Sequence, residues 1–210
     1  MLMSKRSFLI GSGALAAFGS SCVPARSAHA QLPRTPSGDL GPFYPVEKPL
    51  GTGADLTGNA RAKGDIIELS GRILAADGTP QAHARVELWQ ANAVGRYAHP
   101  GDDRADVPLD PSFQGYADLE ADADGVFRCR TVKPGPYPAG GTFQRAPHIH
   151  FDVRGRQRRL ITQMYFESDT VLHAQDKVLQ HDLWGKTTPL PSNIFAHLGE
   201  GAHYTFDIVL

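Results

Sequence analysis

Two histidines, two residues apart, are the strongest chemical signal in this sequence. His148 and His150 flank Ile149, and Phe151 follows. Because alternate side chains of a β-strand point to the same face, both imidazoles would face one way, with Ile149 and Phe151 on the other face. A strand fixes the separation of two such imidazoles before any metal binds, so the pair forms half of a metal site. The alternative is a pair of polar residues on a solvated strand face.

Two tyrosines upstream could complete such a site. Tyr137 is predicted to lie in a stiff turn rich in proline and glycine, and Tyr97 follows Gly95-Arg96. Phenolate is a hard anionic donor, so a site with two phenolates favours ferric iron over zinc or cuprous copper. Such an iron resists reduction and would have to activate an organic substrate instead of dioxygen. Alternatively, both tyrosines are core aromatics whose hydroxyls find hydrogen-bond partners.

Several short segments are predicted to be strands that position these residues. Alternating or apolar runs are separated by turns such as Ala76-Asp77-Gly78 and the Asp-rich segment that ends at Gly125. The predicted strands are residues 66–74, 83–90, 126–132, 148–153, 160–166 and 204–210. We expect an all-β fold, an antiparallel β-sandwich with long loops, and one or two short helical turns within residues 170–184. Residues 41–45 are expected to form a fixed loop that packs on the body.

The N-terminal 30 residues have the pattern of an export signal. Lys5 and Arg6 precede an uncharged, mostly apolar segment, and Ala28-His29-Ala30 is a small-x-small cleavage site. The segment from Ser4 to Leu9 also resembles a twin-arginine signal, with Lys5 in place of the first arginine. We therefore expect residues 31–210 to form one exported domain, in the periplasm. A lipid anchor at Cys22 is disfavoured because Gly19 stands where a large aliphatic residue is expected.

Composition restricts the class of protein further. The chain has 210 residues, 41% of them hydrophobic, and a formal net charge of −1, which is typical of one globular domain. Residues 31–210 hold 18 basic and 22 acidic residues, a net charge of −4, and no basic run that would indicate nucleic-acid binding. Cys129 is the only cysteine after the signal, so we expect a small core residue and no intrachain disulfide.

The motifs together resemble the intradiol ring-cleavage dioxygenases, and most closely the iron-binding chain of the protocatechuate type. The resemblance covers essentially all of residues 31–210, in the family's order. The matching segments are Gly41-Pro42-Phe43-Tyr44-Pro45, Glu87-Leu88-Trp89-Gln90-Ala91-Asn92, Gly95-Arg96-Tyr97, Leu109-Asp110-Pro111, residues 130–138, His148-Ile149-His150-Phe151, Leu160-Ile161-Thr162-Gln163 and Phe206-Asp207-Ile208-Val209-Leu210.

This resemblance implies an enzyme with non-haem Fe(III). The iron would be held by Tyr97, Tyr137, His148 and His150, with a hydroxide as fifth ligand. A catechol-type substrate would bind through both oxygens, while Tyr137 leaves the metal and takes up a proton. Reaction with O2 would open the ring between the two hydroxyl-bearing carbons and give a muconate-type dicarboxylate.

The resemblance also assigns roles around the metal. It implies that Arg145 stabilises negative charge on the ring, a task that suits a permanently ionised guanidinium. It implies that Gln163 orients this arginine and that Pro42 and Tyr44 line the substrate pocket. The alternative for Arg145 is an ordinary surface cation.

Two departures from the family pattern leave the substrate open. Ala139 and Gln144 stand where the protocatechuate enzymes have tryptophans. The substrate could thus be protocatechuate, catechol, hydroxyquinol or a substituted catechol, such as a lignin-derived or chlorinated one. The protocatechuate group is built from two related chains, so we expect a homo-oligomer or pairing with a related chain.

A second function class competes with the enzyme. Gly71-Arg72-Ile73, Asp77-Gly78 and the Asp124-Gly125 turn also resemble non-catalytic transthyretin-like or carboxypeptidase-regulatory β-sandwich modules. Such modules bind partners and need no metal, so they would not require two tyrosines, an arginine and two histidines together.

Overall fold

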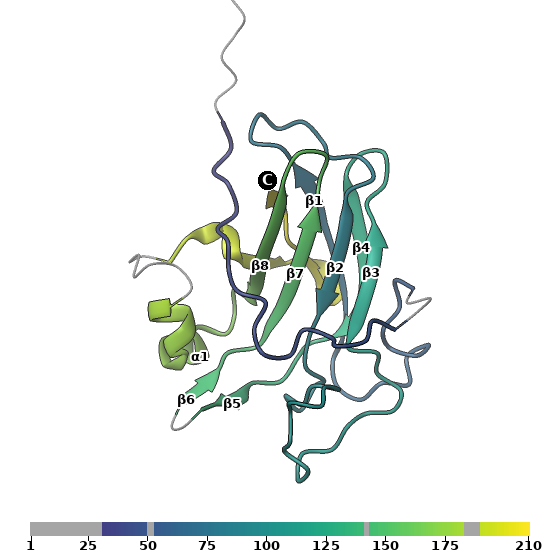
Figure 1. Cartoon of the computed structure of the whole chain (residues 1–210), viewed down its shortest axis with the longest axis vertical. Coiled ribbons are helices and arrows are strands. Elements are labelled where there is room, and N and C mark those ends of the chain that lie inside the picture. Colours follow the sequence, from purple (N-terminus) through teal and green to yellow (C-terminus); the bar gives the residue numbers. More distant parts are fainter. Residues whose placement is uncertain (1–30, 50–52, 141–142, 183–189) are drawn as a thin grey trace, which may run out of the picture.

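A computed structural model describes residues 31–49, 53–140, 143–182 and 190–210 (Figure 1). Strands dominate the described residues: β1 Ile66–Leu74, β2 Arg85–Trp89, β3 Tyr116–Glu120, β4 Val126–Val132, β5 Tyr137–Ala139, β6 Phe143–Arg145, β7 His148–Arg154, β8 Arg159–Phe166, β9 Phe195–Leu198, β10 His203–Thr205 and β11 Ile208–Val209. The helical segments are short: α1 Thr170–Gln175, the π-helical turn η1 Val178–Asp182, and the 3-10 turns η2 Ser192–Ile194 and η3 Glu200–Ala202. The all-β prediction is confirmed.

The pairing of the strands is mixed, and in this respect the antiparallel prediction is wrong. One sheet has the order β11-β1-β10-β9-β8-β7-β2-β3, with β4 paired to β1, while β5 and β6 form a separate hairpin. β10 and β11 run parallel to β1, and β9 runs parallel to β8. The connection after β8 contains α1 and η1, and parallel neighbours need a crossover of this kind.

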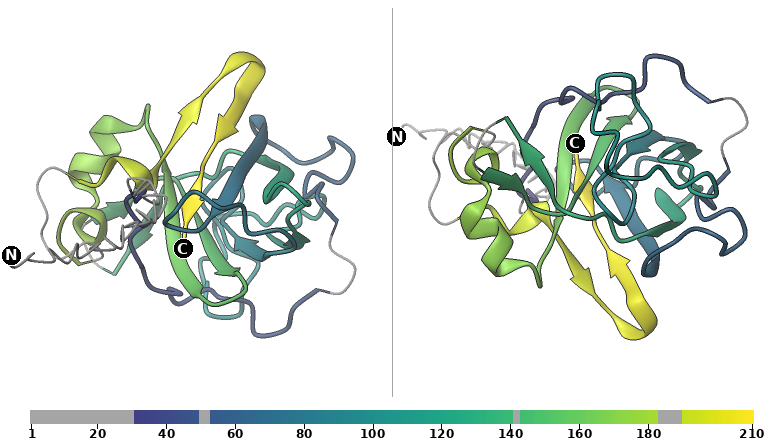
Figure 2. Two further views of the ribbon diagram at one scale, coloured as in Figure 1. Left: turned by 90° about the horizontal axis from the view of Figure 1, so that it is seen from above. Right: turned by 90° about the horizontal axis from the view of Figure 1, so that it is seen from below.

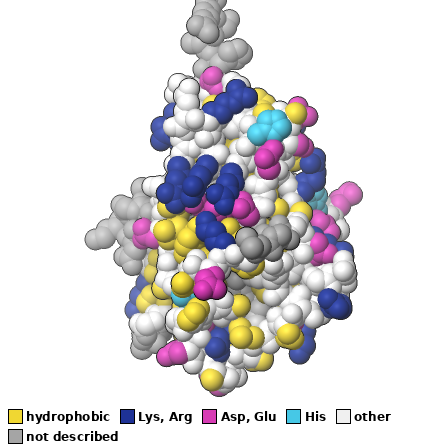
Figure 3. Space-filling view, turned by 45° about the vertical axis from the view of Figure 1, so that its right-hand side comes forward, with side chains coloured by type: hydrophobic (Ala, Val, Ile, Leu, Met, Phe, Trp, Pro, Cys, Tyr) yellow, Lys and Arg dark blue, Asp and Glu magenta, His cyan; other side chains and the backbone are white. Residues whose placement is uncertain are grey.

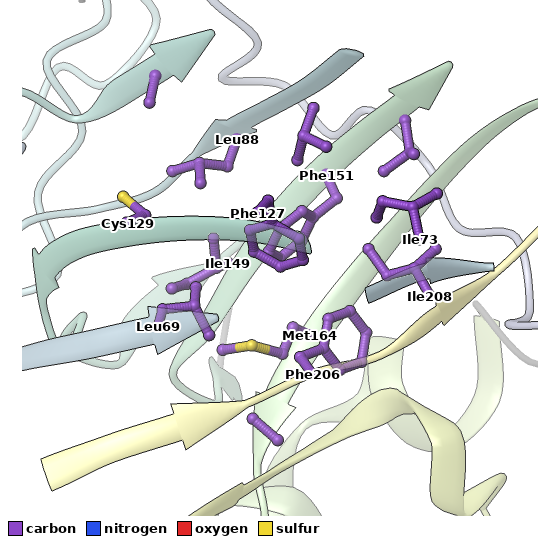
Figure 4. Packing of buried hydrophobic residues seen from close by; sticks show 14 of the residues in the cluster. Leu69, Ile73, Leu88, Phe127, Cys129, Ile149, Phe151, Met164, Phe206 and Ile208 are labelled. Carbon is purple, nitrogen blue, oxygen red and sulfur yellow. The ribbon is translucent and has the colours of Figure 1, made fainter. Parts of the chain in front are cut away.

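The main core lies where the sheet folds back on itself. β1 and β4 lie behind β2, β7 and β8 in Figure 1, and Figure 4 shows their apolar side chains meeting between them. The Phe127 ring of β4 lies 5.8 Å from the Phe151 ring of β7, which in turn lies 5.5 Å from Phe206. Cys129 is buried in this core, as predicted. The core therefore anchors the strand that carries both histidines.

Most predicted elements are present, with three corrections. The segment 204–210 is two strands, because the Phe206 amide bonds to Ser70 and Asp207 accepts the Arg72 amide between them. Tyr137 begins β5 and is not part of a turn. Four short strands were not predicted: β3, β5, β6 and β9. Of these, β5, β6 and β9 show no alternation of apolar and polar residues. The helical turns expected within 170–184 form as α1 and η1.

The outer face of β2 and β7 carries buried carboxylates under a layer of cations. Glu87 and Asp152 are direct cross-strand partners, an arrangement of like charges that would be destabilising alone. Lys48 and Arg85 pair with Glu87 at N–O distances of 2.7 and 2.9 Å. Arg154 and Arg159 pair with Asp152 at 3.1 and 2.8 Å. Figure 3 shows Lys and Arg side chains gathered with acidic ones on one face of the molecule.

The chain segments outside the sheets pack at one end and one edge of it. The N-terminal arm, residues 31–49, runs across the β2-β7-β8 face, and α1 contacts β6 at the side (Figure 1). β9 and β10 form a hairpin that projects from the body, as Figure 2 shows in yellow. No helix in the described ranges is long and apolar enough to span a bilayer. The predicted export signal and Cys22 lie outside the described residues.

A substitution at Gly71 in β1 can test how closely the segment between β10 and β11 packs against β1. A Cβ built at Gly71 would lie 1.8 Å from the Phe206 carbonyl oxygen, so Gly71→Ala must push the segment between β10 and β11 away. We expect a loss of about 1–3 kcal/mol in the free energy of unfolding, or more, by urea denaturation. Gly53→Ala is the control, because a Cβ there meets no atom within 4 Å. Equal stability of the two variants would contradict the close approach.

Candidate active site

β7 places both histidines on one face, as predicted. Ile149 and Phe151 point into the main core, whereas His148 and His150 lie on the opposite face. Both imidazoles are nevertheless buried, because the N-terminal arm and the β5–β6 hairpin cover that face. The Trp89 ring on β2 stacks on the His150 ring at 4.9 Å with an angle of 10° between the planes. The strand and this stack together fix the orientation of the His150 ring.

Two interlocked loops bring the tyrosines together. Gly95 has a positive φ of 80°, and a Cβ there would lie 2.2 Å from the Pro136 carbonyl oxygen. Because Gly95 has no side chain, the loop before Tyr97 can pack directly on the segment before Tyr137. Asn92 shapes the loop, since its Oδ1 accepts the Arg96 amide at 2.9 Å. As a result the two tyrosine rings lie 5.4 Å apart, nearly perpendicular.

Tyr97, Tyr137, His148 and His150 form one cluster. The Tyr137 hydroxyl lies 3.3 Å from His148 Nε2, and the two histidine rings are 4.9 Å apart. His148 Nδ1 must carry its proton, because it donates to the Ala146 carbonyl at 2.6 Å. Nε2 is then the unprotonated nitrogen and presents its lone pair to the cluster, as metal-binding histidines require.

Burial sets the charge state of these groups. It lowers the pKa of His148 well below 6.5 and the pKa of His150 to about 3, and the nearby Arg145 charge lowers both further. Burial also raises the pKa of Tyr97, with a further increase from Tyr137, and raises the pKa of Tyr137. Without a metal, the cluster therefore consists of neutral imidazoles and neutral phenols at neutral pH.

The cluster fits a hard, highly charged metal ion. The Tyr97 hydroxyl is buried without a well-directed hydrogen-bond partner among the described residues, an arrangement that a ligand would relieve. Within the described ranges, no group of three or more His, Cys, Asp or Glu side chains could hold a metal. A metal in this cluster would thus depend on the phenols, and two phenolates with two imidazoles suit ferric iron.

Arg145 is buried beside the cluster, not on the surface. Its Nη2 donates to Gln163 Oε1 at 2.8 Å and to the Tyr165 hydroxyl at 2.9 Å. Its Nε lies 3.1 Å from both carboxylate oxygens of Asp176. The structure thus brings Gln163 to the arginine as expected, and it adds Tyr165 and Asp176. The position of Tyr165, two residues after Gln163 on one strand, was the available sequence signal. Asp176 gave none.

A cleft of about 420 Å³ opens beside Tyr97. Its lining includes Phe43, Pro45, Trp89, Tyr97, His99 and Tyr116. Phe43 lies over the Tyr97 ring at 4.6 Å, so the loop 41–45 packs on the body as predicted. Pro42 and Tyr44 are not among the residues that line this cleft, and the Tyr44 hydroxyl donates to Glu87 at 2.7 Å.

Comparisons with known proteins agree on one family. A family model described as "Dioxygenase" matches residues 40–210. The chain is 41% identical over 180 residues to the protocatechuate 3,4-dioxygenase beta chain of Burkholderia cepacia, covering 80% of this chain and 76% of that one. It is 30% identical to the alpha chain from the same organism, covering 84% and 92%.

Solved structures share the fold. The dioxygenase domain of a carbohydrate-binding fusion protein from a cellulolytic Streptomyces superposes with a TM-score of 0.63 and 24% identity, covering 85% of this chain and 98% of that one. The binding-module alternative gains no support from these comparisons. Together with the buried cluster of two phenols, two imidazoles and a guanidinium, they show that this chain belongs to the intradiol ring-cleaving dioxygenases.

Proposed function

We propose that this protein is a non-haem Fe(III) dioxygenase that opens a catechol-type ring between its two hydroxyl-bearing carbons to give a muconate-type dicarboxylate. The observation that carries the proposal is the convergence of Tyr97, Tyr137, His148 and His150 beside a buried arginine. When bound, the ferric ion would supply Lewis acidity that withdraws electron density from a coordinated catecholate.

The residues of this chain divide the remaining work. Burial raises the pKa of Tyr137, so the phenolate of Tyr137, once it is released from the metal, would be basic enough to take up a proton from the catechol. Arg145 supplies fixed positive charge where the substrate carries negative charge, and Gln163 and Tyr165 hold its Nη2. Trp89 and Phe43 cover His150 and Tyr97 with aromatic rings and keep water from these ligands.

The substrate class is a small catechol with O2 as second substrate. The cleft beside Tyr97 is walled mostly by aromatic and proline side chains, which suits a planar ring. We propose that Phe43 and Pro45, in the loop 41–45, form part of the wall of the substrate site. Assembly of this chain with a second copy or with a related chain would complete that wall. The beta and alpha chains of protocatechuate 3,4-dioxygenase are both relatives of this chain.

Colour provides the direct test of the metal site. Protein loaded with ferric iron should show a broad tyrosinate-to-iron absorption band, and a catechol added without oxygen should shift it to longer wavelength. Tyr97→Phe should lose most of the band and bind less iron, because it removes one of the two phenolate donors. Tyr204→Phe is the matched control, since Tyr204 lies in the main core. A colourless iron-loaded wild type would overturn the site.

Acid should destabilise the metal-free protein through the buried histidines. The unfolded chain takes up protons on these residues below pH 6.5, whereas the folded pKa of His150 is about 3. The free energy of unfolding therefore falls as the pH drops from 6.5 towards 3. His150→Gln should lose less stability between pH 7 and pH 5 than the wild type, measured by urea denaturation. His203→Gln, an exposed control, should behave like the wild type.

Arg145→Lys should reduce ring opening and leave the metal site in place. A lysine keeps the charge, but its single nitrogen cannot replace the guanidinium, which contacts Asp176 through Nε and donates to Gln163 and Tyr165 through Nη2. We expect kcat/KM for catechol to fall about 100-fold, the scale of one lost electrostatic donor, with iron content and colour retained. Arg128→Lys, at an exposed ion pair with Asp122, is the control. Activity equal to this control would remove Arg145 from the mechanism.

A further inference from the structure

We propose that Asp176 is a positioning residue that fixes the guanidinium of Arg145 and the backbone of Ala146, whose carbonyl orients His148. The effect of Asp176 on catalysis rests on the proposed function, whereas its effect on the stability of the protein can be tested without that function. Asp176 follows α1 directly and is fully buried. A fully buried carboxylate needs several hydrogen-bond donors, and the donors around Asp176 connect it to the candidate active site.

Asp176 accepts hydrogen bonds from three directions. Both of its oxygens lie 3.1 Å from Arg145 Nε. Oδ2 also accepts the Ala146 amide at 2.9 Å, and Oδ1 accepts the Leu179 amide at 3.0 Å. The carboxylate thus ties the end of α1 and the start of η1 to the segment between β6 and β7.

The charge of Asp176 is what permits Arg145 to be buried. The other partners of the guanidinium, Gln163 and Tyr165, are neutral groups that cannot balance its charge. Asp176 is the one acidic partner of Arg145 among the described residues. Removing one member of a buried ion pair leaves an uncompensated charge and costs about 3–5 kcal/mol, far more than loss of an exposed pair. Without Asp176, the arginine would therefore tend to turn towards water.

The contacts also fix the direction in which Arg145 can act. Asp176 holds Nε, while Gln163 and Tyr165 hold Nη2. Nη1 makes no hydrogen bond to a described residue, so it is the donor left for an anionic ligand. Burial has the largest effect on the pKa values of the four cluster residues, and the positive charge of Arg145 acts on each of them towards a lower pKa.

The same carboxylate reaches His148 through the backbone of one residue, Ala146. Asp176 Oδ2 accepts the Ala146 N–H, and the Ala146 carbonyl accepts His148 Nδ1–H at 2.6 Å. Because that carbonyl selects the tautomer, a shift of Ala146 would disturb the nitrogen that faces the cluster. Asp176 therefore positions two functional groups with one side chain.

A double-mutant cycle tests the proposal. Asp176→Asn removes the charge with little change in shape, and Arg145→Met removes its partner. Asp169→Asn is the matched control, because it breaks another ion pair beside the same helix, with Lys133 at 2.7 Å, and no contact to Arg145. We expect Asp176→Asn to lower kcat for catechol about tenfold or more, with KM changed less, and Asp169→Asn to retain wild-type kcat.

The coupling decides between positioning and a general structural role. In the Arg145→Met background, Asp176→Asn should lower kcat by a clearly smaller factor than in the wild type, because the part of its effect that acts through Arg145 has already been lost and only the part through Ala146 remains. If Asp176→Asn lowers kcat equally in both backgrounds, the positioning role is wrong. A variant that fails to fold alone but folds together with Arg145→Met also supports the pairing.

Thermal unfolding of the metal-free protein gives a readout independent of activity. Each single variant should lower Tm, and the double variant should lower it by less than the two effects added together. Additive losses would overturn the proposed pairing even in an active enzyme. If the wild type opens no catechol, the proposed function fails, while the Tm cycle still decides whether Asp176 holds Arg145.

Discussion

The burial of one positive charge constrains the whole candidate site. Arg145 lies inside the protein, and a guanidinium there is tolerated only if its donors are satisfied and its charge is balanced. β8 supplies Gln163 and Tyr165, and the end of α1 supplies Asp176. The helix that follows β8 packs beside β6, and it lies in the crossover that leads to β9, which pairs parallel to β8.

The four proposed metal ligands follow a complementary rule, because they are buried as neutral groups. Two imidazoles with lowered pKa values are ready to bind a metal, whereas two phenols with raised pKa values must first lose protons. An ion that can displace those protons has to be strongly Lewis acidic. As a metal site, this cluster would thus disfavour weakly acidic divalent ions, and the fixed charge of Arg145 would favour the phenolate form.

The sequence allowed us to predict which face of a strand each side chain takes, but few of the contacts between segments that are distant in the chain. The His148 and His150 pair, β1, β4 and β8 could be predicted, because alternation within a strand decides which face each side chain takes. The role of Gln163 beside Arg145 could be inferred only by resemblance. Asp176 could not be found, because it meets the arginine through tertiary packing across 31 residues. The parallel pairing of β10 and β11 was missed for the same reason: short strands carry no signal of their partner's direction.

The polar face of β2 links the surface charges to the buried site. Glu87 and Trp89 lie two residues apart on this strand and therefore share a face. Glu87 holds the N-terminal arm through Tyr44 and Lys48, while Trp89 stacks on His150. The arm in turn places Phe43 over Tyr97. Because Glu87 is buried under its cations, this attachment is screened by salt much less than an exposed ion pair would be. The same strand thus excludes water from the candidate ligands and fastens the segment that covers them.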